Sequence, residues 1–118
     1  LDNENNERRK IANIYNQKLI NKNIILPLEN KFSFHVYHHY VIRLKKRDKF
    51  LKYMKKNGYN LGIHYRLPVH KQKLLSNNDF KLPYTEKISR EIVSLPIYTG
   101  LGKNSQYKII KTINSFTF

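Results

Sequence analysis

The residue types that could do chemistry are concentrated between Gly62 and Gln72. This segment brings two imidazoles, a phenol, a guanidinium and a carboxamide together around Pro68; they belong to His64, Tyr65, Arg66, His70 and Gln72. A loop of this kind can present hydrogen-bond donors to phosphate or sugar oxygens. An ordinary strand exit whose polar groups satisfy one another would have the same composition. The residues alone leave these two interpretations equal.

The other candidate sites are weaker. Three of the five histidines, His35, His38 and His39, lie together, but on a strand His38 points away from the other two. With no cysteine and few carboxylates nearby, a metal site is not predicted. No Gly-x-Ser-x-Gly context supports a serine nucleophile. Gly100-Leu-Gly102 lacks the rest of a dinucleotide fingerprint and indicates a turn.

The charge balance is strongly basic. The chain has 23 Lys and Arg against 8 Asp and Glu, a formal net charge of +15, and the basic residues are densest between residues 43 and 56. This favours a polyanionic partner, although codon bias toward Lys and Asn explains much of it equally well. One hypothesis is therefore a basic nucleic-acid-binding module that stacks bases on Tyr37, Tyr40 and Tyr53.

Length and composition set further bounds. With 118 residues, 40% of them hydrophobic, the chain can bury one core. The lack of cysteine excludes disulfides and thiol nucleophiles, and is compatible with a reducing, cytoplasmic location. No apolar run approaches the ~20 residues of a membrane span, and the polar N-terminus does not resemble a signal peptide.

Hydrophobic periodicity predicts the elements of the first half. Residues 6–21 have helical spacing, and residues 33–44 are dense in aromatic and β-branched types, which predicts a strand of about ten residues. The core side of this strand is expected to carry Phe34, Val36, Tyr40 and Ile42. A second helix should begin at Arg47-Asp48 and end at Asn57-Gly58.

The second half is predicted to contain a short strand over residues 61–65 and two helices. One is capped by Thr85, runs through Ile92 and closes at Leu95-Pro96. The other begins near Asn104, with a stripe formed by Tyr107, Ile110, Ile113 and Phe116. A third strand is expected near residues 97–98 or 24–25. This order predicts an α+β fold, a small and mainly antiparallel sheet flanked by helices.

Several motifs resemble the DegT/DnrJ/StrS family of pyridoxal-phosphate-dependent nucleotide-sugar aminotransferases. Gly62-Ile-His64-Tyr65 followed by Pro68-x-His70-x-Gln72 is similar to a segment in the C-terminal part of that family. Further similar motifs occur in the same order along the chain: Arg8-Arg9 through Leu19, His38-His39 through Arg43, Arg47-Asp48 with Lys56-Asn57-Gly58, and Thr85 through Tyr98. The resemblance covers essentially all 118 residues.

The resemblance implies that residues 1–118 are the C-terminal small domain of a fold-type I enzyme. The Schiff-base lysine for pyridoxal phosphate would lie on an N-terminal large domain outside this sequence, so the chain alone is expected to be inactive and to hold no cofactor. Carried over residue by residue, His64 and Tyr65 are expected to contact the sugar or diphosphate, while His70 and Gln72 shape the loop. Arg43 is a weaker candidate, because a structural role fits it equally well.

For the parent enzyme, the resemblance implies transfer of an amino group from an amino donor to a nucleotide-linked keto-sugar. The product would serve amino-sugar and surface-polysaccharide biosynthesis. The parent is expected to be a cytoplasmic homodimer without a nucleic-acid or membrane partner. A non-catalytic remnant is the remaining alternative.

Overall fold

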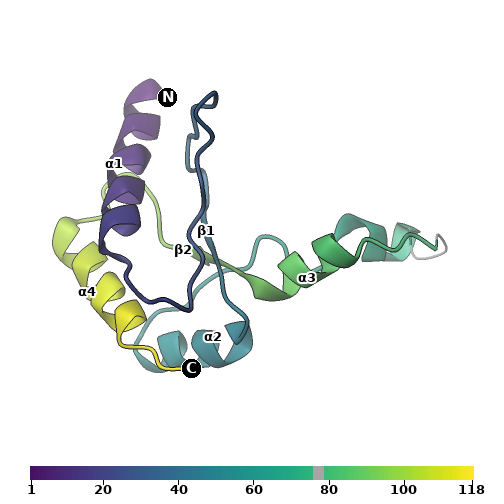
Figure 1. The fold of residues 1–118 in the computed structure, drawn as a ribbon. Coiled ribbons are helices and arrows are strands. Elements are labelled where there is room, and N and C mark those ends of the chain that lie inside the picture. The colour runs from purple at the N-terminus through teal and green to yellow at the C-terminus, as the bar shows by residue number, and fades with distance from the viewer. Residues whose placement is uncertain (76–78) are drawn as a thin grey trace.

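The computed structural model describes residues 1–75 and 79–118. A body of helices around two strands carries an arm that projects to one side (Figure 1). The elements follow the order α1 (Asp2–Lys18), β1 (Tyr40–Arg43), α2 (Arg47–Lys56), the 3₁₀ helices η1 (Val69–Lys71) and η2 (Lys73–Leu75), α3 (Pro83–Glu91), β2 (Ile92–Leu95) and α4 (Lys103–Asn114). The arm contains η1, η2 and α3. The predicted α+β fold is confirmed.

The sheet consists of β1 and β2, paired antiparallel from Tyr40 opposite Leu95 to Arg43 opposite Ile92. Residues of a strand alternate between its two faces, and here Tyr40, Ile42 and Val93 face the core. Two isolated bridges widen the sheet, one from Ile25 to Arg43 and one from Gly62 to Ser94. The extra strand predicted near residues 24–25 is thus present as a single bridge, as is the strand predicted over residues 61–65.

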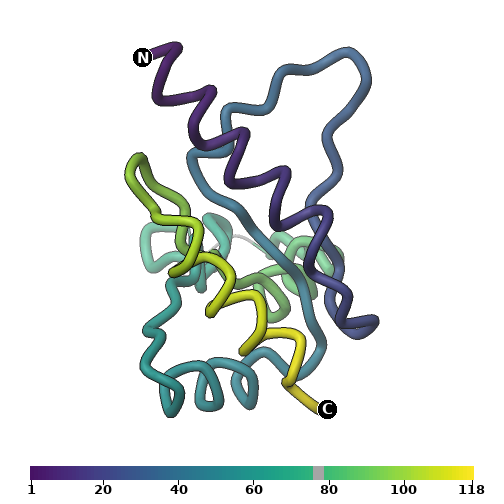
Figure 2. The backbone as a smooth tube through the Cα atoms, turned by 90° about the vertical axis from the view of Figure 1, so that its left-hand side faces the viewer, coloured from purple at the N-terminus to yellow at the C-terminus, as the bar shows by residue number. Residues whose placement is uncertain are grey.

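The core lies between the sheet and the helices α1, α2 and α4. In Figure 2, α1 and α4 run alongside each other in front of the strands. The fully buried side chains include Tyr15 from α1, Phe50 from α2 and Ile113 from α4. Gln106 is buried too, and its Nε2 donates to the backbone oxygen of Ile11 at 2.8 Å, which joins α4 to α1.

The predicted strand over residues 33–44 is wrong in its first part, because only Tyr40–Arg43 pair with a partner strand. Tyr37 has a positive φ of 48° and turns the chain, so its side chain enters the core beside Tyr40. The alternation is therefore broken, and Phe34 and Val36, predicted to be buried, are exposed. A hydrophobic run favours a strand only where a partner strand is available.

The helix predictions hold with corrected ends. The first helix begins four residues earlier and ends three residues earlier than predicted, at Asp2 and Lys18. α2 matches its prediction, and Gly58 follows it with φ +90°. The third helix begins at Pro83 rather than after a Thr85 cap, and it ends at Glu91.

Two further corrections concern the C-terminal third. Residues Ile92–Leu95, predicted as the end of a helix, form β2, because pairing with β1 outweighs local preference. In α4, Tyr107 is half exposed, and the neighbouring Gln106 occupies the buried position. No helix within the described ranges is both long and apolar enough to cross a membrane.

Candidate functional site

A pocket of about 310 Å³ lies where the chain around His64 meets the end of β2. Ser94 alternates with the core residues Val93 and Leu95, so its hydroxyl faces away from the core. The Nδ1 of His64 lies 2.9 Å from Ser94 Oγ, within hydrogen-bonding distance. The bridge between Gly62 and Ser94 fixes this approach, since Ser94 N donates to Gly62 O at 2.9 Å.

His39, immediately before β1, completes the pocket. Its ring stacks on His64 with centroids 4.0 Å apart and planes 12° from parallel, and His38 meets its edge at 4.4 Å. Burial lowers the pKa of His39, and the nearby His64 and His38 lower it further. The lowered pKa favours the neutral form of the His39 ring at neutral pH.

Tyr65 lies next to this pocket, against the ring of His64. Its side chain is 74% exposed and meets His64 edge to face at 5.7 Å; the peptide bond that joins the two residues is cis. Tyr65 also borders an apolar groove of about 400 Å³ toward α3, together with Val69 and Tyr84. Its phenol can thus reach a molecule bound beside His64 without moving a core residue.

His70 and Gln72, predicted to shape the same loop, lie on the arm. His70 is buried, and its Nε2 lies 3.1 Å from Glu86 Oε1 on α3. This contact, more than the ion pair with Lys71, lowers the pKa of Glu86. Gln72 follows η1 and is exposed. Among the described residues, no hydrogen bond or ring contact joins this pair to His64 and Tyr65.

Arg43, the weaker candidate, is paired within the fold. Its Nη2 donates to Glu91 Oε2 at 2.9 Å, across the junction between α3 and the sheet. The hydrogen bond to Glu91 raises the pKa of Arg43. This contact joins neighbouring elements, and it gives Arg43 a structural role.

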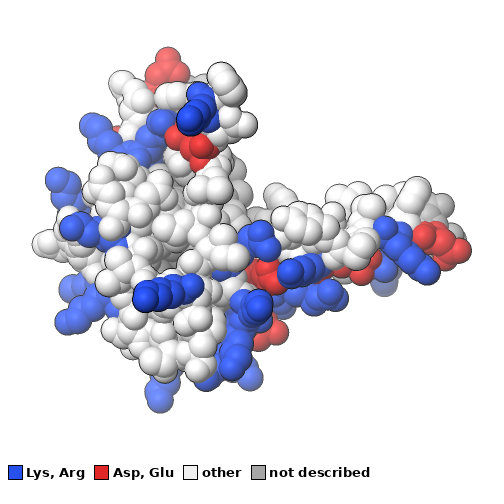
Figure 3. Space-filling model, in the orientation of Figure 1, with Lys and Arg blue, Asp and Glu red and all other residues white. Residues whose placement is uncertain are grey.

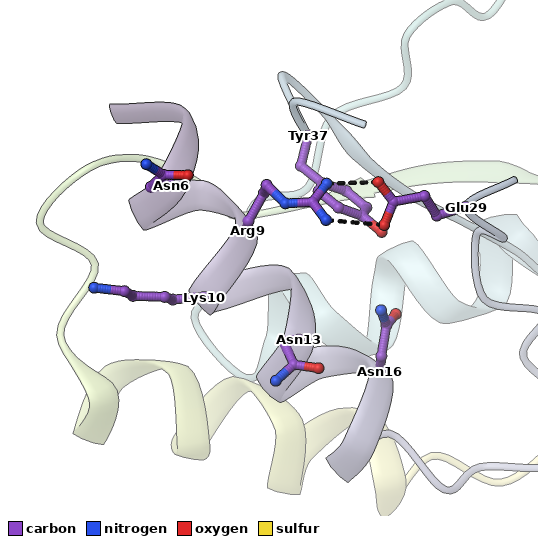
Figure 4. A pocket seen from close by; sticks show the side chains of 7 residues that line it. All are labelled: Asn6, Arg9, Lys10, Asn13, Asn16, Glu29 and Tyr37. Atoms are coloured by element: carbon purple, nitrogen blue, oxygen red, sulfur yellow. Dashed lines mark hydrogen bonds and ion pairs between the residues drawn. The ribbon is translucent and has the colours of Figure 1, made fainter. Parts of the chain in front are cut away.

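Another cavity, of about 500 Å³, lies between α1 and the loop that precedes β1 (Figure 4). Arg9 is bidentate to Glu29, with distances of 2.5 and 3.2 Å, and Nη1 also donates to His35 O at 2.7 Å. The guanidinium lies 4.1 Å from the ring centroid of Phe34. Because its charge is neutralised, Arg9 holds the loop against α1 rather than offering a site for an anion.

Two alternatives from the sequence can be compared with the structure. Within residues 1–75 and 79–118, no three histidine or acidic side chains are placed to hold a metal ion. The nucleic-acid hypothesis predicted that Tyr37, Tyr40 and Tyr53 stack on bases. This is wrong for two of them, because Tyr37 is 4% exposed and Tyr40 is fully buried. A buried ring cannot stack on a base.

Sequence reasoning missed His39 and Ser94 as members of the pocket. His39 was noted as one of three neighbouring histidines and as part of a family-like motif, but not as a site residue, and Ser94 was expected at the end of a helix. A signal was present, because a serine that alternates with Val93 and Leu95 would face the polar side of a strand. Recognising it requires knowing that residues 92–95 are a strand.

Comparison with known proteins gives consistent matches. The sequence profile of the DegT/DnrJ/EryC1/StrS aminotransferase family matches residues 1–114. The chain is 34% identical, over all of its length, to dTDP-3-amino-3,6-dideoxy-alpha-D-galactopyranose transaminase from Aneurinibacillus thermoaerophilus, and covers 33% of that protein. Over 75% of its length it is 33% identical to dTDP-3-amino-3,4,6-trideoxy-alpha-D-glucose transaminase from Micromonospora megalomicea, and covers 25% of it.

Solved structures agree. DesV from S. venezuelae, in complex with a ketimine intermediate, matches 96% of the chain with a TM-score of 0.90 and 26% identity. A DegT DnrJ EryC1 StrS aminotransferase from Brucella abortus matches 94% with a TM-score of 0.84 and 27% identity. The chain covers 32% and 30% of those structures. It therefore spans about a third of the length of its relatives.

Proposed function

The chain belongs to the DegT/DnrJ/EryC1/StrS aminotransferase family, and we propose that it contributes His64 and Tyr65 to the sugar-nucleotide site of a pyridoxal-phosphate-dependent aminotransferase. The resemblance predicted from the sequence motifs is confirmed. Because the chain spans about a third of its relatives, we infer that it is the small domain of a larger enzyme. The named relatives are transaminases, which gives no support to the nucleic-acid alternative.

The proposed substrate is a nucleotide-linked keto-sugar, aminated at the expense of an amino donor. Relatives named for dTDP-linked and UDP-linked sugars support this class. The observation that carries the site assignment is the placement of His64. Its Nδ1 is held by Ser94 and its ring by His39, while its Nε2 has no hydrogen bond among the described residues and is left to meet a ligand.

The pyridoxal phosphate of the proposed enzyme supplies an electron sink for the transfer when it is bound. A lysine that holds it as a Schiff base needs a desolvated setting, whereas every lysine of this chain is exposed. Residues 1–118 therefore do not fit the anchoring site. We assign the lysine to the two thirds of the parent that this chain does not cover.

The contribution of the chain is binding and orientation. Because the lowered pKa favours the neutral form of His39 at neutral pH, the stacked pair avoids two adjacent positive charges. His64 can then exchange hydrogen bonds with a sugar hydroxyl or a diphosphate oxygen. The exposed phenol of Tyr65 supplies a second donor beside it. Two fixed donors orient a sugar better than one, which lowers the entropy lost on reaction.

The test replaces Tyr65 by Phe in the full-length enzyme. Losing one hydrogen bond of ~1–3 kcal/mol should raise the KM for the nucleotide-sugar roughly five- to a hundredfold. Cofactor absorbance should stay unchanged, because its anchor lies elsewhere. Tyr107→Phe, a half-exposed tyrosine on α4, is the matched control. If Tyr65→Phe and His64→Ala lowered the melting temperature while leaving sugar kinetics unaltered, the assignment would be wrong.

A further inference from the structure

A second cavity, of about 420 Å³, lies between α3, the end of β1 with the residues that precede α2, and the C-terminal Phe118. Five basic side chains line it: Lys22, Arg43, Lys45, Lys46 and Lys87. They come from three separate stretches of the chain, at residue 22, residues 43–46 and residue 87, so the fold brings part of the basic run together with two distant lysines. Figure 3 shows Lys and Arg side chains gathered over α2 and along the lower edge of the arm. None of the residues of the His64 pocket takes part.

The positive charge in this cavity is largely uncompensated. Glu91 is its acidic lining residue, and its carboxylate is already paired with Arg43. In the part of the chain that the structure describes, Lys22, Lys45, Lys46 and Lys87 have no ion-pair partner. The Nε of Arg43 is buried without an acceptor, the one such side-chain atom among the described residues. Like charges that converge without a counterion repel one another, and a bound anion relieves this repulsion.

The rest of the lining is apolar. Ile25, Leu44 and Phe118 form a wall beside the basic side chains. The ring of Phe118 meets that of Phe116 edge to face at 4.8 Å, which holds it in place against the core. An aromatic ring next to convergent lysines suits a molecule that joins a planar ring to phosphate groups. The cavity volume lies within the range of small-molecule sites, ~300–1,000 Å³.

We propose that this cavity binds a nucleoside diphosphate, with the phosphates between Lys45, Lys46 and Lys87 and the base against Phe118. The lysines act as mobile point charges, which suits a flexible diphosphate. This site goes beyond the function proposed above, and it depends neither on the assignment of His64 and Tyr65 nor on catalysis.

Calorimetric titration of the whole chain with uridine diphosphate, at physiological salt, tests the proposal. The triple variant Lys45→Gln/Lys46→Gln/Lys87→Gln should weaken binding at least tenfold. The control Lys49→Gln/Lys52→Gln/Lys55→Gln removes the same charge from α2 outside the cavity, and should change binding by less than about twofold. Equal weakening in both variants would overturn the proposal, because binding would then depend on net charge alone. Absence of binding to the unaltered chain would overturn it as well.

The apolar wall is tested with pyrophosphate as a second probe. Uridine diphosphate should bind the unaltered chain about tenfold more tightly than pyrophosphate. Phe118→Ala should remove this advantage and leave pyrophosphate affinity unchanged, with the melting temperature confirming that the variant is folded. Equal affinity of the two probes for the unaltered chain would show that the apolar wall does not bind the base. The assignment of the ligand as a nucleoside diphosphate would then be wrong.

Discussion

His39 and His64 lie face to face, with ring centroids 4.0 Å apart, although 25 positions separate them in the sequence. The contact joins the start of β1 to the loop that carries Tyr65. It also places two titratable rings where they cannot both be protonated without repulsion. The pair therefore couples the geometry of the candidate site to pH.

The pKa of His39 should be measurably below the ordinary histidine value of 6.5. In a two-dimensional NMR titration of the imidazole protons, His64→Ala should move this pKa upward, because the variant both uncovers the ring and removes a neighbouring charge. His70→Gln, on the arm, should leave it unchanged. A His39 titration midpoint at or above 6.5 in the unaltered chain would contradict the assignment.

Stability should fall as the pH drops below about 6.5. The pKa of His39 is lower in the folded protein than in the unfolded chain, so the unfolded chain binds the proton at a higher pH. Acidification from pH 6.5 down to the pKa of the folded state therefore favours unfolding. His39→Gln should flatten the dependence of the unfolding free energy on pH between 7.5 and 5. The pKa values of Glu29 and Glu86 are lowered below 4.5, so the stability that these carboxylates contribute is lost only at more acidic pH. Their titration therefore does not overlap with that of His39. An unchanged slope in His39→Gln would refute the coupling.

Two phenylalanines at opposite extremes of burial test the core. Phe50 is fully buried and meets Phe116 edge to face at 5.2 Å, whereas Phe32 is 97% exposed. Phe50→Ala should lower the unfolding free energy in urea by about 3–5 kcal/mol, because it leaves a cavity. Phe32→Ala should change it by less than about 0.5 kcal/mol. Similar losses from the two variants would show that the core is not where the structure places it.

The glycines after α2 and before α4 form another matched pair. Gly58 has φ +90°, whereas Gly102 has φ −64°, and an added Cβ would meet no atom within 4 Å at either position. Gly58→Ala should therefore cost about 1–2 kcal/mol through backbone conformation alone. Gly102→Ala should be within about 0.5 kcal/mol of neutral. Thermal denaturation compares the two, and a neutral Gly58→Ala would contradict the left-handed end of α2.

Structural features that depend on residues close together in the sequence could be predicted from the sequence alone. The helix from Arg47 was predicted at both ends, because Asp48 suits the positive end of a helix and Gly58 accepts a positive φ. The family followed as well, since it depends on motifs read in order along the chain. His64 and Tyr65 were singled out in the same way, from residue types packed into one segment.

Features that depend on distant contacts were decided only by the tertiary structure. Ile92–Leu95 became a strand because β1 lies beside it, and Phe34 and Val36 lost their predicted burial because Tyr37 turns the chain. The partners of His64, namely Ser94 at 30 positions and His39 at 25, could not be found locally. His70 was separated from His64 because Glu86 on α3 holds it on the arm. Local preferences amount to less than about 1 kcal/mol per residue, and burial and pairing across the chain exceed them.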